Sequence, residues 1–330
     1  MKSVRYLVLA LASVGNPVLA HHGMPTLGAI SLDGPGAPVE TSSSATLGQG
    51  SWLLSLKMDH AKFETGRTPP PDQNAESEYN QYWLLTLGYG FKPWLTAYVT
   101  QPYNVKVDEP DGVDSRGLAD LSVGAVIGFK YDDGFILTPV NESLDDLMDW
   151  HFSAMAGMTL PTGNPNKRLQ GGIIDPGKST SFGKPSFSYG LTATRQFTEK
   201  ATFVAEAAQT RFQKYTYDDG NSMKFGTETR LNTALAYRLM KHAESRFRLD
   251  GVAELNYLKL GRDEANGQGE DATGGKMVYG VLGVRLYKDN MSLALALKKP
   301  VWTDLNEEDD QQGAEGTEDY RFIANLSIAF

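Results

Sequence analysis

The chain has 330 residues, no cysteine, a formal net charge of -9 and a mean hydropathy of -0.35. The lack of cysteine excludes disulfides, thiolate metal sites and cysteine nucleophiles, and the acidic balance argues against nucleic acid as a partner, because binding a polyanion requires clustered Lys and Arg. After the first twenty residues no apolar run approaches the roughly 18 residues that a spanning helix requires, so a helical membrane protein is excluded as well.

Residues 1–20 have the pattern of a secretory signal peptide. Lys2 and Arg5 precede an apolar core that runs from Tyr6 to Val14, and Val18-Leu19-Ala20 supplies a small-residue cleavage signal. The alternative is an N-terminal membrane anchor, which the short apolar core disfavours. We expect export, cleavage after Ala20 and a mature chain that begins at His21.

Residues 21–49 are rich in Gly, Pro, Ser and Thr and have little to bury. Two alternatives are open for this N-terminal segment: a linker in the periplasm, or a plug inside the barrel that the next residues predict. Partial insertion is slightly favoured, since a barrel of this size is usually obstructed.

From residue 50 onward, apolar and polar residues alternate with period two, which indicates strands. One segment places Phe247, Leu249, Leu255 and Tyr257 on one face and charged or amide residues on the other. Its phase breaks at Leu258-Lys259, where we expect the strand to leave the membrane or to carry a bulge. Twelve strands are predicted, at 50–63, 80–91, 94–105, 117–130, 150–161, 184–196, 201–215, 224–239, 246–261, 275–287, 290–299 and 319–330.

Three features favour a transmembrane barrel over a soluble sandwich. Aromatic residues stand near the ends of the apolar faces, the polar faces carry ionised groups that a dry core could not accept, and long polar connections alternate with short ones. The connection 131–149 departs from this pattern, and we expect a short helix at 142–149. The fold class predicted for residues 50–330 is therefore all-β, an antiparallel up-and-down β-barrel of about 12 strands.

The last strand supports the same interpretation. Residues Tyr320 to Phe330 alternate and finish on an aromatic, which resembles the closing strand of outer-membrane barrels, whose final aromatic is read by the assembly machinery. We expect a Gram-negative outer-membrane protein whose partners are lipid, lipopolysaccharide, the barrel assembly machinery through Phe330, and a small-molecule solute.

The polar faces predict a charged lumen. In one interpretation these side chains pair and hold the shape of the wall; in the other they line a permeation path and set its selectivity, and both can hold at once. The candidates are Lys57, Asp59, Asp120, Lys130, Glu206, Glu228, Arg230, Arg238, Arg248, Asp250, Glu254, Arg285, Lys298 and Arg321.

Other chemistry has weaker support, and we predict no catalytic residue and no cofactor. His21 and His22 are weak candidates for Cu²⁺ or Zn²⁺, since no third ligand is evident. His151 and Ser153 have the spacing of outer-membrane phospholipase A, but Ala154-Met155 follows where that enzyme has Asn-Gly. The acidic loop 304–310 either bridges cations to lipopolysaccharide or is simply solvated.

Three motifs carry a family resemblance. Leu160-Pro161-Thr162-Gly163, Asp175-Pro176-Gly177 and Ser181-Phe182-Gly183-Lys184-Pro185-Ser186 resemble the outer-membrane family linked to meta-pathway phenol degradation. The resemblance implies transport of aromatic or other hydrophobic small molecules and carries over no binding residue.

We therefore predict a porin-like channel for passive uptake of small molecules, gated by a loop or by the N-terminal segment. The alternative function is a structural or adhesion barrel that binds partners through its acidic outer loops, above all residues 303–317.

Overall fold

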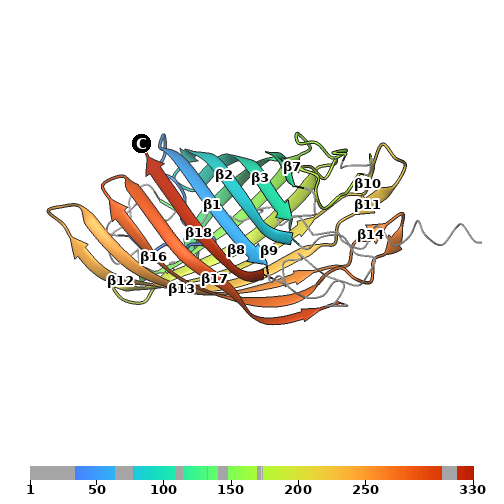
Figure 1. The fold of residues 1–330 in the computed structure, drawn as a ribbon. Helices are drawn as coiled ribbons and strands as arrows, with labels where there is room; N and C mark the ends of the chain where they lie inside the picture. Colours follow the sequence, from blue (N-terminus) through green and yellow to red (C-terminus); the bar gives the residue numbers. More distant parts are fainter. Residues whose placement is uncertain are drawn as a thin grey trace, which may run out of the picture.

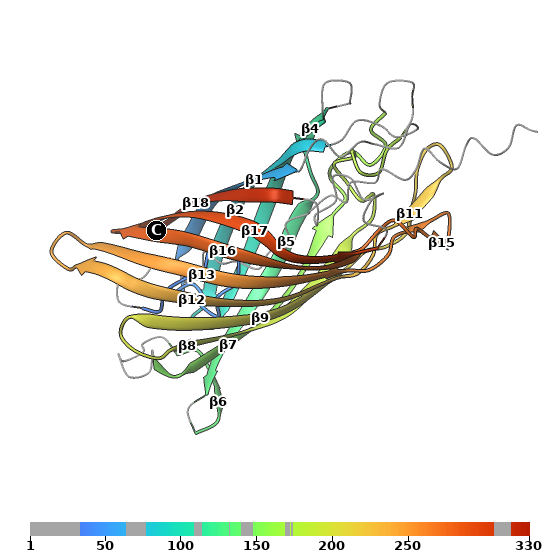
Figure 2. The same cartoon turned by 60° about the horizontal axis from the view of Figure 1, so that its bottom comes forward.

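The structure, a computed structural model, describes residues 34–63, 77–108, 114–131, 133–139, 148–168, 172, 174–306 and 318–330. Twelve long antiparallel strands form a closed barrel (Figures 1 and 2). They are β1 (Trp52–Phe63), β2 (Ser77–Lys92), β3 (Leu95–Asp108), β5 (Leu121–Tyr131), β7 (Trp150–Leu160), β8 (Ser186–Gln196), β9 (Ala201–Arg211), β12 (Glu228–His242), β13 (Phe247–Leu260), β16 (Gly275–Lys288), β17 (Met291–Leu305) and β18 (Glu318–Ala329).

The first and last strands close the barrel. β1 pairs with β18 from Leu53 to Phe63, and the Trp52 amide donates to the Phe330 carbonyl oxygen over 2.7 Å. Because every long strand has a neighbour on both sides, no row of backbone groups is left without partners along an edge. The predicted twelve-stranded antiparallel barrel is confirmed.

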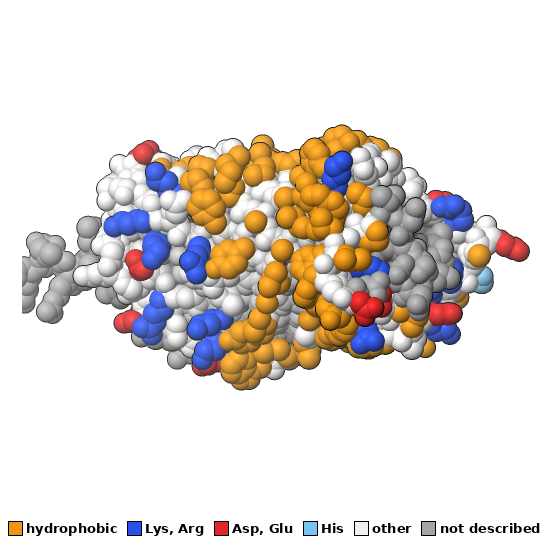
Figure 3. All heavy atoms as spheres, turned by 180° about the vertical axis from the view of Figure 1, so that it is seen from behind, with side chains coloured by type: hydrophobic (Ala, Val, Ile, Leu, Met, Phe, Trp, Pro, Cys, Tyr) orange, Lys and Arg blue, Asp and Glu red, His pale blue; other side chains and the backbone are white. Residues whose placement is uncertain are grey.

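The outer surface of the barrel is apolar. Large hydrophobic side chains on alternate positions point outward, and Leu282 in β16 is 71% exposed. Figure 3 shows these side chains gathered around the middle of the molecule, with charged side chains toward both ends. Such a band fits the hydrocarbon layer of a bilayer. Among the described residues, no helix is long and apolar enough to cross a membrane.

The two ends of the barrel differ. Tight turns join β2 to β3, β8 to β9, β12 to β13 and β16 to β17 at one end, here called the turn end, where Arg246 and Asp289 adopt positive φ angles of 48° and 54°. The connection from β5 to β7 at this end holds β6 (Phe135–Leu137), which pairs with β5. Residues 142–147 of the helix predicted at 142–149 lie outside the described residues.

The other end, here called the loop end, carries structure that the periodicity did not predict. β4 (Ser115–Leu118) pairs with β3, so the strand predicted at 117–130 is two elements. β10 (Tyr215–Thr216), β11 (Ser222–Lys224), β14 (Glu264–Ala265) and β15 (Gln268–Gly269) form a small separate sheet. These short strands lie in segments predicted as the end of a long strand and as loops, because pieces of two or three residues are too short to show a period.

The bulge predicted as one alternative at Leu258-Lys259 is wrong, whereas the other alternative, that the strand leaves the membrane there, stays a prediction. β13 keeps its register with both β12 and β16 through Leu260, and Leu258 is buried in the lumen against Met277 and Tyr279. Here the inner wall is itself apolar, so an inward leucine does not interrupt the alternation.

Candidate functional site: the plugged lumen

Residues 34–49, from here on called the plug, lie inside the barrel. The plug begins near the turn end, where the Gly36 amide donates to Thr202 Oγ1 over 2.8 Å. It returns to that end at Leu47, whose amide donates to Thr96 Oγ1 over 2.8 Å, and the chain then enters β1. Between these points it reaches strand residues far from the turns, so that residues 40–42 form the tip of an inward loop.

Arginines of the wall hold the first half of the plug by its carbonyl oxygens. Arg248 and Arg238 donate to the Gly34 oxygen over 2.8 and 3.0 Å, and Arg285 donates to Ala37 over 3.3 Å and to Pro38. Arg248 is fixed by two hydrogen bonds to Asp250, of 2.8 and 2.6 Å. The guanidinium groups therefore supply the donors that a backbone without regular structure needs.

Two glutamates hold the plug tip by its donors. Glu254 accepts hydrogen bonds from the amides of Val39, Glu40 and Thr41 at 2.6, 3.0 and 2.8 Å, and from Thr41 Oγ1 at 2.6 Å. Glu206 accepts from the amide of Ser42 at 3.1 Å and from its hydroxyl. Carboxylates are acceptors only, so they match a run of backbone N–H groups.

Glu40 is the one charged residue of the plug, and it joins a buried ion-pair network. Its carboxylate pairs with Lys57 and, over 3.1 Å, with Lys298. Lys57 also pairs with Asp59 over 3.2 Å, and Asp59 lies 4.0 Å from Arg321. Charges of β1, β17 and β18 thus meet around a single plug carboxylate.

The remaining predicted lumen residues also lie on the inner wall, with one exception. Lys130 is buried, and its Nζ lies 3.6 Å from Oδ2 of Asp149. Arg230 pairs with Glu228, and Arg238 is half-buried. Thirteen of the fourteen candidates lie on barrel strands, namely all except Asp120. Their role in selectivity stays a prediction.

Asp120 belongs to the loop end instead. It lies between β4 and β5, and its carboxylate accepts hydrogen bonds from the amides of Gly163 and Phe182, each 3.0 Å long. Burial raises the pKa of the Asp120 carboxyl, although these hydrogen bonds and one from Ser181 oppose the rise. Asp120 therefore ties two of the family motifs together.

Those motifs lie in a loop, here called the cap, that spans residues 161–185 between β7 and β8 and is described except for 169–171 and 173. The cap packs against the mouth of the lumen: Lys106 of β3 donates to the Gly177 oxygen, and Ser115 of β4 donates to the Lys178 oxygen over 2.5 Å. A Cβ on Gly163 would lie 2.5 Å from the Thr180 carbonyl oxygen, so this close crossing requires glycine. The cap thus packs at the end of the barrel opposite to the one where the plug enters.

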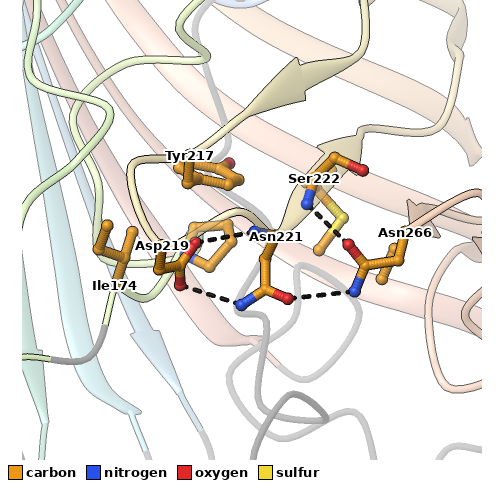
Figure 4. Close-up of a pocket in the computed structure, with 9 residues that line it drawn as sticks. Ile174, Tyr217, Asp219, Asn221, Ser222 and Asn266 are labelled. Carbon is orange, nitrogen blue, oxygen red and sulfur yellow. Dashed lines mark hydrogen bonds between the residues drawn. The ribbon is translucent and has the colours of Figure 1, made fainter.

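A small hollow lies beside the cap (Figure 4). Its polar rim is used internally: the amide nitrogens of Asn221 donate to Asp219 over 3.0 Å, and Asn266 Nδ2 donates to Asn221 Oδ1 over 3.3 Å. Among the residues around it, Ile174, Tyr217, Met223 and Ala265 belong to the cluster that joins the cap to the small sheet.

The other candidate sites receive no support from the geometry. His21 and His22 lie outside the described residues, and within the described ones no group of three or more His, Cys, Asp or Glu could hold a metal ion. The Ser153 hydroxyl donates to Thr192 Oγ1 over 3.1 Å, and Nδ1 of His151 lies 3.1 Å from the Asp149 carbonyl oxygen.

Sequence reasoning missed Glu40, Thr41 and Ser42 as partners of the wall. Within residues 34–49 Glu40 is the single charged residue, and a lone acid that faces a lumen predicted to hold lysines and arginines was the signal that could have found it.

Comparison with known proteins agrees with the predicted resemblance. The family model described as "Putative MetA-pathway of phenol degradation" matches residues 79–306. No curated protein matches the sequence.

One solved structure has the same fold, and two others are less similar. An outer membrane channel from Pseudomonas putida F1 is 12% identical, with a TM-score of 0.67 over 88% of this chain and 100% of its own. The β domain of the Bordetella autotransporter BrkA is 13% identical (TM-score 0.44, 85% and 99% covered), and LpxR from Salmonella typhimurium is 8% identical (TM-score 0.44, 83% and 99% covered).

Proposed function

The chain belongs to the family described as "Putative MetA-pathway of phenol degradation", and from this membership and the plugged lumen we propose that it is an outer-membrane channel for passive uptake of small molecules, closed at rest by its N-terminal plug. The signal-peptide pattern of residues 1–20 supports export to that membrane. The family description supports aromatic or other hydrophobic solutes as cargo, and the P. putida relative is itself described as an outer membrane channel.

The observation that carries the proposal is how the plug is attached. Wall arginines, lysines and glutamates hold it through hydrogen bonds and ion pairs, and among its apolar side chains Val39 packs against wall residues such as Val252 and Val281. Water can replace part of the hydrogen bonding to a polar wall once the plug leaves, whereas it cannot replace an apolar core. A plug held in this way can leave and return.

The polar inner wall supports passage rather than mere stability. A buried ion pair adds little net stability, because desolvation offsets the Coulomb attraction. Once the plug leaves, the same charges would face water and line a path of both signs. We propose no catalytic role for the lumen.

The test uses purified protein in planar bilayers, with the full chain compared against a deletion of residues 34–49. We expect small or rare conductance steps from the full chain and larger, longer ones from the deletion, with the added flux repeated in a liposome uptake assay. Full-length and plug-deleted barrels that both assembled but carried neither current nor solute would refute the channel. Gel mobility before and after heating reports assembly in each case.

A further inference from the structure

An arginine stands in an aromatic row on the outer surface at the turn end. The row follows the paired register of β6, β5, β7, β8 and β9, and its members, in that order, are Phe135, Tyr131, Trp150, Arg195 and Phe203. Register partners share a face of the sheet, and the row continues to Leu235 of β12, which is 48% exposed. Arg195 therefore lies on the outward face of the barrel rather than in the lumen.

The row lies at the level where a bilayer changes from hydrocarbon to headgroups. Arg195 is the last outward residue of β8, which ends at Gln196, and aromatic side chains of membrane proteins gather at this interface. The short turns of outer-membrane barrels face the periplasm. Since phospholipids form the periplasmic leaflet of that membrane, the molecules beside Arg195 carry a phosphate at its level.

Two aromatic rings hold the guanidinium group of Arg195. Its central carbon lies 5.5 Å from the ring centroid of Trp150 and 5.5 Å from that of Phe197, and a cation is attracted to ring faces at such distances. Within the described part of the chain, no carboxylate or other acceptor takes a hydrogen bond from its side chain. Nε is enclosed by protein, whereas Nη1 and Nη2 are not. The rings thus fix the cation and leave the donors of Nη1 and Nη2 for another molecule.

Two other exposed arginines have the protein partner that Arg195 lacks. Arg246, also at the turn end, pairs with Asp289 over 3.0 Å. Arg211 lies near the loop end, 5.6 Å from the ring centroid of Tyr189, and its Nε donates to Gln209 over 2.9 Å. The chain has a net charge of -9, so carboxylates are not scarce, and yet none of the described ones pairs with Arg195. The acceptor for this guanidinium therefore has to come from outside the protein.

The surface between Arg195 and the middle of the membrane is apolar. Phe152 lies in the next outward row and stacks on Trp150 and Phe129, with ring centroids 6.1 and 5.7 Å apart. Leu191, two outward positions before Arg195 on β8, is 62% exposed. This surface continues the apolar band of the barrel, so a hydrocarbon chain that lies against it is out of water while its charged end reaches the arginine.

We propose that Arg195, held between Trp150 and Phe197, binds the phosphate of one glycerophospholipid of the periplasmic leaflet. Nη1 and Nη2 donate to the phosphate oxygens, and the acyl chains lie along Phe152 and Leu191. A phosphate offers the acceptors that guanidinium N–H groups match, and hydrogen bonds between charged groups are stronger than those between neutral ones. A lipid without a phosphate would leave the cation without an anion.

The test is native mass spectrometry of the full-length barrel, released from detergent in the presence of increasing dioleoylphosphatidylglycerol. We expect one lipid to bind first. Its half-saturating concentration should rise roughly fivefold to twentyfold in Arg195→Gln, between the effect of an exposed ion pair and that of a charge-assisted hydrogen bond. Arg246→Gln is the matched control, because it removes the same charge at the same end from a residue that already has a carboxylate partner. It should leave lipid binding unchanged.

Two further ligands separate the phosphate from the rest of the lipid. Dioleoylglycerol, which has the same chains and no phosphate, should bind wild type and Arg195→Gln equally, and inorganic phosphate should not displace the phospholipid. Arg195→Lys keeps the charge but loses the planar stack on the rings, so its half-saturation should lie between the other two, and it replaces Arg195→Gln if that variant assembles poorly.

Three results would overturn the lipid site: equal half-saturation in wild type and Arg195→Gln, an equal shift in Arg246→Gln, or displacement of the phospholipid by inorganic phosphate. Because binding is measured without transport, the outcome does not depend on whether the barrel conducts.

Discussion

Replacing Glu254 by Ala should unseat the plug. The carboxylate accepts three backbone amides and one hydroxyl of residues 39–41, at 2.6 to 3.0 Å, within a buried site. Hydrogen bonds to a charged group contribute about 1.5–3 kcal/mol each. For each of the four bonds we take the lower value and let water that enters the space left by the side chain restore about half of it. The seated plug then loses on the order of 3 kcal/mol in total, which is a roughly hundredfold shift toward the open state.

The assay is the reaction of a single thiol with a membrane-impermeant maleimide. The chain has no cysteine, so Ser43→Cys, a buried plug position, supplies the only thiol. We expect the labelling rate to rise by one to two orders of magnitude when Glu254→Ala is added, and the open-channel probability in bilayers to rise with it. Glu254→Gln keeps the shape but loses the charge, and should fall between wild type and Glu254→Ala.

Glu264→Ala is the control, because it removes a carboxylate from the small sheet at the loop end, where Glu264 pairs with Lys224 over 2.7 Å in an exposed position. It should leave the labelling of the plug unchanged. Equal labelling of Ser43→Cys with and without Glu254→Ala would show that the plug is not held by this carboxylate, and the reasoning about its attachment would fail.

Three further predictions concern the loop end and the lipid face. Burial, with repulsion from Glu270, raises the pKa of Asp263 to about 6. Since this pKa lies above the ordinary aspartate value of 3.8, the stability that the carboxyl adds is complete below about pH 4 and is lost as the pH rises through 6. Limited proteolysis of the loop 261–274 should therefore accelerate over that range in wild type but not in Asp263→Asn. Asp120→Ala should cost the cap about 2–4 kcal/mol, because it leaves the buried amide of Phe182 and the partly buried amide of Gly163 without an acceptor, and the amide exchange of both should become faster. Leu282→Arg places a charge on the outward face at mid-strand. In a denaturant titration in vesicles it should lower the free energy of unfolding by about 2–4 kcal/mol, whereas an unchanged value would contradict a lipid-facing position.

The strands could be predicted closely, and the small errors have a common cause. The twelve predicted ranges differ from the observed strands by a few residues at most ends, because alternation is a property of each strand that its own residues display. The errors at 117–130, at 201–215 and at Leu258 all lie toward the loop end. There the lumen and loops contain apolar clusters, so inward and outward residues no longer differ in polarity.

Thirteen of the fourteen lumen candidates lie on barrel strands, but their partners could not be predicted from the sequence. Asp120 looked like a wall residue because it stands one step before an alternating segment, and only the fold shows that the cap motifs converge on it. The plug contacts were equally hidden, since nothing in Glu40 or Ser42 alone indicates Lys57 or Glu206.

The sequence by itself determined the barrel. Each strand must present one face to lipid and the other to water, and this requirement is visible within each strand as alternating apolar and polar residues. The tertiary structure alone decided what fills the barrel. The amide of Val39 meets Glu254 across 215 residues of sequence, and this contact exists only because β1 and β18 close the wall and bring both residues into one enclosed space. Hydrogen bonds and ion pairs of this kind depend on the distance between two atoms in the folded structure, and the alternation of residues along a strand does not predict that distance.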